Sequence, residues 1–242
     1  MARIIQKKSD LKQAYIKAKA CAFFGYLIAA LCFAGAVVTT LRTMFPVLLL
    51  FAVGVMAGIG FGGYSSQKAE IYRCGIVGEN ATAEIVRHLP NGYYVVQNVV
   101  VKYEGKLSEL DLVVLGPTGV FVVETKYLKG NVVGNYAGDR WELHKVGRGG
   151  TSYSKTFYSP VKQVGTHVYR LANYLRKKGV NVWVEGMVCF SNPETELFLQ
   201  GAPSKIPVFS VFEGDGVDLC NYITHREKEL SDSQIQRILK MI

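Results

Sequence analysis

The chain has 242 residues, a formal net charge of +9, 49% hydrophobic residues and 19% charged residues. This composition excludes an intrinsically disordered chain, which would be less hydrophobic for its charge. The five cysteines are widely spaced and form no C-x-x-C pair, which argues against a disulfide framework and a zinc knuckle. They are typical of small core residues in a reducing compartment.

Two stretches near the N-terminus, residues 20–41 and 43–67, contain no charged residue. Within them, residues 21–41 and 44–64 are predicted to form transmembrane helices, because about 20 apolar residues at about 1.5 Å per residue cross the hydrocarbon core. A cleaved signal peptide is disfavoured, since the first apolar run is too long and a second follows directly. The short connection at Arg42 predicts a tight transmembrane hairpin.

The basic residues before the first span predict the orientation. Residues 1–20 form a basic arm rich in Lys and Arg, whereas the connection between the spans carries Arg42. We therefore expect a two-span protein of the cell membrane with both termini in the cytoplasm. The arm either lies on the anionic inner leaflet of the lipid bilayer or acts only as an orientation signal. Because residues 1–20 and Arg42 together hold most of the net charge, the high net charge of the chain does not by itself indicate a nucleic-acid-binding protein.

Gly54, Gly58 and Gly62 recur at every fourth residue of the second span. Small residues at this spacing let two helix backbones approach closely. The stripe is expected to serve either the hairpin itself or a homo-oligomer. Neither span carries an ionisable residue, which disfavours a transporter.

Residues 77–242 are predicted to form one folded domain, joined to the spans by a linker helix or loop over residues 65–76. Its fold class is α/β, with the order helix, three-strand meander, helix and strand. A further strand and a terminal helix, opened by a capping box at Ser231 and Gln234, are expected after this core. The segments are a helix over residues 78–89, strands over 93–103, 107–115 and 120–126, short strands near Val132 and Trp141, a helix over 161–178, and strands over 182–190 and 206–212.

The turn at residues 116–119 predicts how two of these strands pair. If Gly116 pairs with Gly119, Asp111 lies opposite Glu124 on the same face of the sheet. Like charges across a ladder are destabilising, and Lys126 on the same face compensates only one of them. A divalent cation such as Mg²⁺ would relieve the repulsion, and a Lys beside it could orient or deprotonate a water molecule. Each residue alone is commonplace on a strand, but together, among apolar neighbours, they favour a site.

Several short motifs resemble one family. They are Gly78-Glu79 at the start of a helix, the runs ELDLVV over residues 109–114 and GVFVVETK over residues 119–126, then Gly130 and Trp141. Together they look like the nuclease-related domain (NERD) family, a branch of the PD-(D/E)XK nuclease superfamily, from about residue 76 to residue 190. The resemblance implies a restriction-endonuclease-like core after the transmembrane hairpin.

The resemblance also implies roles for individual residues. Glu79, Asp111 and Glu124 match the carboxylates that bind Mg²⁺ in this superfamily, with Mn²⁺ as the other candidate, and Lys126 matches the lysine that assists the water. Glu84 is the competing helix carboxylate and is expected to be a surface residue. The run Ser159-Pro160-x-x-Gln163 resembles the family's Asn-Pro-x-x-Gln motif, in which Gln163 would face the site, although Ser stands here in place of Asn.

A basic stretch follows the meander. Residues 143–184 contain no acidic residue, and their Lys and Arg residues alternate with aromatic ones, which suits a phosphate backbone. A solvated basic face beside an anionic membrane is the competing interpretation. Gln163, His167, Arg170 and Tyr174 share one helical stripe; His167 alone is weak evidence of a site. The predicted nucleic-acid contacts are Lys155, Lys162, Arg170 and Tyr174.

The sequence thus predicts a membrane-anchored, Mg²⁺-dependent nuclease that hydrolyses phosphodiester bonds, with DNA as the expected substrate. A catalytically silent nucleic-acid-binding or scaffold domain, tethered to the membrane, is the alternative. A third possibility is a subunit of a membrane complex whose domain contacts only protein.

Overall fold

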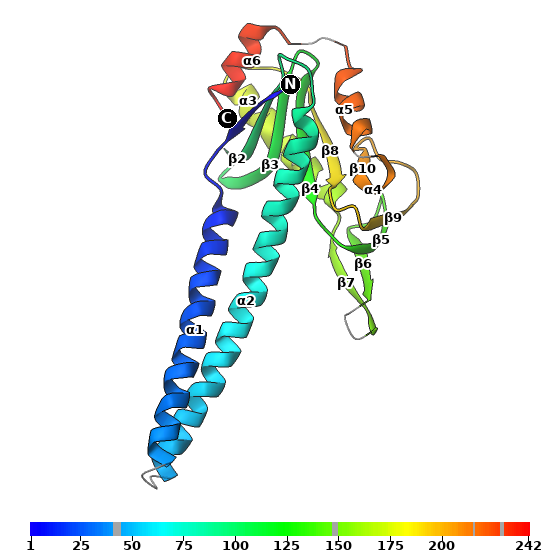
Figure 1. Cartoon of the computed structure of the whole chain (residues 1–242). Coiled ribbons are helices and arrows are strands. Elements are labelled where there is room, and N and C mark those ends of the chain that lie inside the picture. The colour runs from blue at the N-terminus through cyan, green and yellow to red at the C-terminus, as the bar shows by residue number, and fades with distance from the viewer. Residues whose placement is uncertain (41–44, 147–149, 215, 228–229) are drawn as a thin grey trace. The chain divides into compact units, whose positions relative to one another are not determined.

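The structure is a computed structural model that describes residues 1–40, 45–146, 150–214, 216–227 and 230–242. The chain divides into two compact units, which are Met1–Lys8 with Val77–Ile242, and Ser9–Ile76. The predicted connection at Arg42, and Arg148 in the basic stretch, lie outside the described residues. The chain combines helices with two β-sheets, so the predicted α/β fold class is confirmed (Figure 1).

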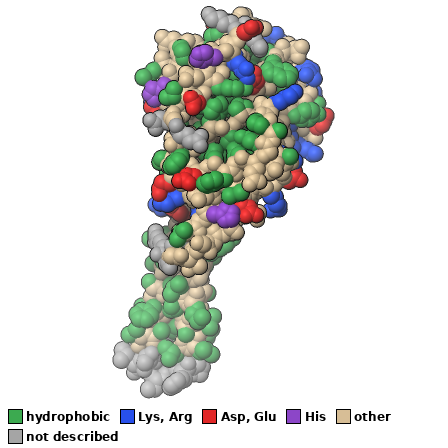
Figure 2. All heavy atoms as spheres, turned by 90° about the vertical axis from the view of Figure 1, so that its right-hand side faces the viewer, with side chains coloured by type: hydrophobic (Ala, Val, Ile, Leu, Met, Phe, Trp, Pro, Cys, Tyr) green, Lys and Arg blue, Asp and Glu red, His purple; other side chains and the backbone are tan. Residues whose placement is uncertain are grey.

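Two long helices make up the unit Ser9–Ile76, namely α1 (Asp10–Thr40) and most of α2 (Phe45–Arg87). By length and composition, both helices are suited to crossing a membrane. Among the coloured side chains in the lower half of this hairpin, Figure 2 shows hydrophobic ones and no Lys, Arg, Asp or Glu. The linker predicted at residues 65–76 is helical, because α2 continues without a break into the folded domain.

The glycine stripe of α2 faces α1. A Cβ atom added to Gly58 would lie 2.7 Å from the carbonyl oxygen of Gly25, and one added to Gly54 would lie 2.5 Å from the Sγ atom of Cys32. By contrast, no atom of the described residues is recorded within 4 Å of such a Cβ atom on Gly60. The stripe therefore serves the contact within the hairpin. Association of two chains through Gly54, Gly58 and Gly62 stays a prediction.

The N-terminal residues differ from the separate basic arm that the sequence suggested. Residues Arg3–Gln6 form strand β1, which pairs in parallel with Tyr94 to Gln97 of β2 (Tyr94–Tyr103). Ala2 is buried, and its N–H donates to the carbonyl oxygen of Arg87 at 2.9 Å. The first residues are thus an edge strand of the folded domain, and α1 begins only at Asp10.

A six-stranded sheet in the order β1-β2-β3-β4-β8-β10 is the centre of the domain. The predicted antiparallel meander of β2, β3 and β4 is confirmed, and β8 pairs in parallel with β4. The predicted strand over residues 206–212 is shorter than expected, because its second half turns into helix α4 (Val211–Gly214). The remaining strands are β3 (Lys106–Gly116), β4 (Gly119–Lys126), β8 (Val184–Phe190) and β10 (Val208–Ser210).

A second, four-stranded sheet has the order β7-β6-β5-β9. The sequence indicated β5 and β6 but not β7, β9 or helix α5 (Val217–Thr224), because segments of six to eight residues are too short to show a clear period. The predicted capping box at Ser231 and Gln234 opens helix α6 (Asp232–Leu239). The four strands are β5 (Gly130–Asn135), β6 (Arg140–Val146), β7 (Ser152–Tyr158) and β9 (Thr195–Gln200).

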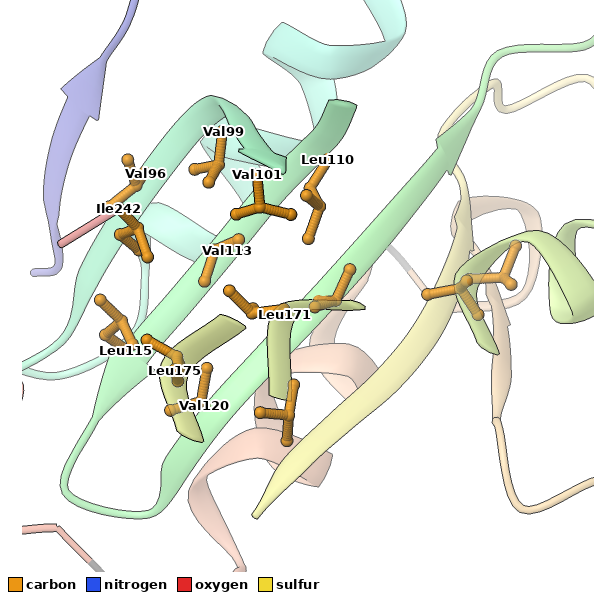
Figure 3. Packing of buried hydrophobic residues seen from close by; sticks show 14 of the residues in the cluster. Val96, Val99, Val101, Leu110, Val113, Leu115, Val120, Leu171, Leu175 and Ile242 are labelled. Carbon is orange, nitrogen blue, oxygen red and sulfur yellow. The ribbon is translucent and has the colours of Figure 1, made fainter. Parts of the chain in front are cut away.

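Helices cover both faces of the six-stranded sheet. Helix α3 (Pro160–Lys177) presents buried apolar residues at helical spacing, including Leu171 and Leu175, to one face, where they pack with Val113 and Val120 (Figure 3). On the other face, residues from the end of α2 and from α5 form a second cluster. Residues 112–115 of β3 and 120–123 of β4 are buried and apolar, so a carboxylate directly beside these runs needs a specific reason.

Candidate functional site: a buried carboxylate pair at the end of strand β4

The turn at residues 116–119 has the predicted register. Gly116 pairs with Gly119, and the ladder continues to Leu112 opposite Val123. The next step along the strands brings Asp111 beside the end of β4, where its Oδ2 atom accepts a hydrogen bond of 2.8 Å from the backbone N–H of Thr125. The side chain of Asp111 is thus hydrogen-bonded to the backbone of β4, the strand that carries Glu124.

A kink in β2 lies across from Asp111. Asn98 has a φ angle of 56°, in the left-handed region that non-glycine residues rarely adopt. The β2–β3 ladder has partners at Gln97 and Val99 but skips Asn98. Val96 and Val99 then point into the same core cluster, although regular alternation would put them on opposite faces. The side chains of β2 therefore switch faces at Asn98, across from Asp111, which is half-buried.

Burial and mutual repulsion favour the protonated forms of the two carboxyl groups. Glu124 is only 2% exposed, and burial raises its pKa above the ordinary value, partly offset by the positive charge of Lys126. Burial, and then the charge of Glu124, raise the pKa of Asp111 to about 7. Two neighbouring carboxyl groups whose pKa values are both raised indicate a site prepared for a positive partner.

Lys126 is held in place by two side chains. Its Nζ atom donates to Oε1 of Glu124 at 2.7 Å and to Oε1 of Gln163 at 3.0 Å. Gln163 lies in the first turn of α3, and its N–H donates to the carbonyl oxygen of Ser159 at 3.0 Å. The start of α3 therefore positions the ammonium group of Lys126, as expected from the resemblance at Gln163.

The third predicted carboxylate, Glu79, lies on α2 near this pair. Its negative charge contributes to the raised pKa of Glu124. Gly78 brings the helix close to the end of β4, because a Cβ atom there would lie 2.6 Å from Cβ of Tyr127. The competing carboxylate, Glu84, is exposed and forms a 3.2 Å ion pair with Arg87. Glu84 is thus a surface residue, as expected.

His167 is part of the site, although the sequence placed it on the helical stripe of Gln163 without predicting a role for it. It is 8% exposed, and its Nε2 atom lies 3.5 Å from Oε2 of Glu124. Burial, together with the charges of Arg170 and Lys126, lowers the pKa of His167 to about 4, so the ring is neutral at pH 7. The signal was present in the sequence as the four-residue spacing between Gln163 and His167, which puts both on one face of α3.

The donor set fits a divalent cation. The Oε2 atom of Glu124 is buried and has no hydrogen-bond partner among the described residues. Carboxylate oxygens are the ligands that Mg²⁺ prefers, and a cation would relieve the repulsion between Asp111 and Glu124. Within the described part of the chain, no three His, Cys, Asp or Glu side chains are grouped so that they could hold a metal ion together. Asp111 and Glu124 are therefore candidate ligands that need further donors, such as water or substrate phosphate, to complete a magnesium site.

Three of the four predicted nucleic-acid contacts bind other parts of the domain. Lys162 forms an ion pair with Asp139. Arg170 donates from Nη1 to the carbonyl oxygen of Leu107 at 3.1 Å and to Oγ of Ser108 at 2.6 Å. Tyr174 donates to the carbonyl oxygen of Met241 at 2.8 Å. Lys155 is exposed on β7, apart from the buried carboxylates.

Comparisons with known proteins agree with this arrangement. The model of the nuclease-related domain family matches residues 75–191, which include all of the residues described above as forming the carboxylate site. An uncharacterized protein of Bacillus anthracis is 35% identical over 92 residues, which cover 37% of this chain and 43% of that protein. No solved structure matches the chain. The matched segment contains Glu79, the β3–β4 hairpin and the start of α3, and residues 75–191 are therefore a nuclease-related domain.

Proposed function

We propose that the domain is a divalent-metal-dependent nuclease that hydrolyses phosphodiester bonds of DNA. The observation that carries this proposal is the buried Glu124 beside the half-buried Asp111, with Lys126 fixed by hydrogen bonds to Glu124 and Gln163. Two neighbouring carboxylates in an apolar environment, next to a positioned lysine, are costly to maintain for the fold alone. Such an arrangement is useful in a site that binds a divalent cation next to a phosphodiester.

In this proposal, each side chain of the site has a separate role. Glu79, Asp111 and Glu124 would hold Mg²⁺, with Mn²⁺ as a substitute. Such an ion supplies Lewis-acid stabilisation of the phosphate and lowers the pKa of a bound water. Lys126, oriented by Glu124 and Gln163, would orient the attacking water or assist its deprotonation. The surrounding apolar strands keep bulk water away from the carboxylates, which strengthens their interaction with a cation.

The two apolar helices support an anchored form of this nuclease. Both are suited to membrane spans, and the basic N-terminal residues suit cytoplasmic termini. The proposal therefore places the protein in the cell membrane with its domain in the cytoplasm. Cleavage would then be confined to DNA that comes near the membrane.

The test uses the full chain purified in detergent, incubated with Mg²⁺ or Mn²⁺ and plasmid DNA, single-stranded DNA or RNA. We expect cleavage of DNA that is lost in Glu124→Gln and Glu79→Gln. The matched control is Glu84→Gln, on the same helix as Glu79 but exposed, which should cleave like the wild type. Binding of DNA without any product under either metal would instead support the catalytically silent binding domain.

A further inference from the structure

A hollow of about 830 Å³ lies at one end of the four-stranded sheet. Its walls come from the start of β5, the end of β6 and the start of β7. The carboxylates, Lys126 and Gln163 do not line it. Its volume falls within the range of about 300–1,000 Å³ that is typical of small-ligand sites, so it has room for a nucleotide.

The lining of this hollow suits an anionic ligand with a flat ring. Lys145 and Tyr153 are cross-strand partners, so their side chains lie on the same face of the sheet. Lys155 follows Tyr153 at the next position on that face. Tyr153 is 53% exposed, and Lys145 is half-buried. The other charged or titratable lining residues are Lys129 and His144, and none of the described lining residues is acidic.

The hollow is close to the carboxylate site along the chain. Two of its lining residues, Lys129 and Gly130, follow Lys126 by three and four positions, so Gly130 lies at most about 14 Å from Lys126. Gly130 has a φ angle of 119°, and a Cβ atom there would clash with the carbonyl oxygen of His144. Because one strand of a duplex advances about 3.4 Å per nucleotide, a few nucleotides cover this distance.

We propose that this hollow binds an unpaired nucleotide of the nucleic-acid substrate, a few nucleotides from the bond cleaved at the carboxylate site. Tyr153 stacks on the base, while Lys145 and Lys155 contact the neighbouring phosphates. The inference rests on the proposed nuclease function and deepens it, because it names a single-stranded segment as the ligand. It also assigns substrate binding to the β6–β7 hairpin rather than to the stripe of Arg170 and Tyr174 on α3.

The test measures binding without cleavage. Full chain in detergent and EDTA is titrated with a fluorescein-labelled single-stranded oligonucleotide. We expect Tyr153→Ala to weaken binding about tenfold and Tyr153→Phe to retain it, since the phenyl ring still stacks. Tyr158→Ala is the matched control, because Tyr158 is also 53% exposed on β7 but points to the opposite face. Wild-type affinity is expected for it.

A second measurement separates the contribution of the lysine charge to oligonucleotide binding from that of base stacking. Lys145→Ala should reduce the salt dependence of binding by roughly one phosphate contact, and Lys102→Ala, exposed on β2, should leave it unchanged. Wild-type affinity in Tyr153→Ala would overturn the inference while leaving the nuclease in place, provided that cleavage with Mg²⁺ persists. An equal loss on a fully paired duplex overturns the assignment to an unpaired base. A wild type that neither binds nor cuts nucleic acid removes the inference and the proposed function together.

Discussion

The Nε2 atom of His167 lies 3.5 Å from the Oε2 atom of Glu124, and neither atom has a hydrogen-bond partner among the described residues. His167 and Glu124 are both buried, with 8% and 2% of their surfaces exposed. A buried polar atom left without a partner costs about 1–3 kcal/mol, so a small approach of the neutral imidazole N–H to the carboxylate would stabilise both groups. His167 is thus placed to hold Glu124 in one orientation while Gln163 holds Lys126.

This contact predicts a positioning role for His167. We expect His167→Leu, which preserves apolar packing, to slow single-turnover cleavage by about tenfold or more, because a hydrogen bond to a charged group contributes about 1.5–3 kcal/mol. His167→Gln restores a donor and should recover most of the rate and of the Mg²⁺ affinity measured by titration. Thr166→Ala, exposed on the same helix, is the control. Equal behaviour of the Leu and Gln variants would show that the ring only fills space.

The raised pKa of Asp111 predicts how stability depends on pH. Below about pH 4 this carboxyl group is protonated in both the folded and the unfolded chain and contributes nothing. Between about pH 4 and pH 7 it is ionised only in the unfolded chain, so rising pH favours unfolding. Without divalent metal, we expect stability to fall across this window and to fall less steeply in Asp111→Asn. Fluorescence of the buried Trp141 during thermal unfolding reports the transition; an unchanged slope would contradict the assignment.

Lys126 is the cation that faces the buried Glu124. Removing one member of such a pair leaves the other uncompensated, so Lys126→Met should cost about 3 kcal/mol of stability at pH 8. The cost should be smaller at pH 5 than at pH 8, because the pKa of Glu124 is raised and lower pH favours its neutral form, and it should largely disappear in the double variant Glu124→Gln/Lys126→Met. Denaturant unfolding at the two pH values measures both effects. A penalty that is independent of pH would mean that the ion pair is not its origin.

The glycines of α2 offer a matched pair for testing the helical hairpin. Gly58→Leu should separate the two helices, because its backbone lies against Gly25, whereas Gly60→Leu has open space and should be tolerated. The readout is a disulfide between Cys32 and a cysteine introduced by Gly54→Cys, positions that are in contact across the hairpin. We expect cross-linking that survives Gly60→Leu, is lost in Gly58→Leu and requires Cys32. Similar cross-linking in both leucine variants would argue against this packing.

Strand β1 predicts that the first residues stabilise the domain rather than only supply charge. Deleting residues 2–7 removes the parallel ladder to β2 and uncovers its edge, which should cost about 3 kcal/mol, or roughly 5–10 °C in Tm. Replacing the exposed Arg3 and Lys7 by Ala removes charge but keeps the strand, and should leave Tm nearly unchanged. Thermal unfolding of both full-length variants decides between the two roles. A larger loss of Tm in the Arg3→Ala/Lys7→Ala variant than in the deletion would show that the positive charge, and not the strand, is the important feature.

The features that could be predicted from the sequence are local ones. The pairing of β3 with β4 follows from a four-residue turn and the alternation of side chains, and Asp111, Glu124 and Lys126 all lie on that hairpin. The two apolar spans follow from composition alone. Glu79 and Gln163 came from resemblance to a family, because no periodicity connects a helix residue with a strand far along the chain.

The features that could not be predicted depend on packing between distant segments. The contact of His167 with Glu124 exists because α3 lies across the sheet with this face inward, and a sequence does not state which face of a helix meets which strand. Strand β1 joins residues about ninety positions apart, and its basic neighbours concealed its apolar side chains. Arg170 and Tyr174 look like free surface residues until the fold brings their partners, Ser108 and Met241, within reach. Periodicity and turn chemistry act over a few residues, whereas the partner of a side chain is decided by how the whole core closes.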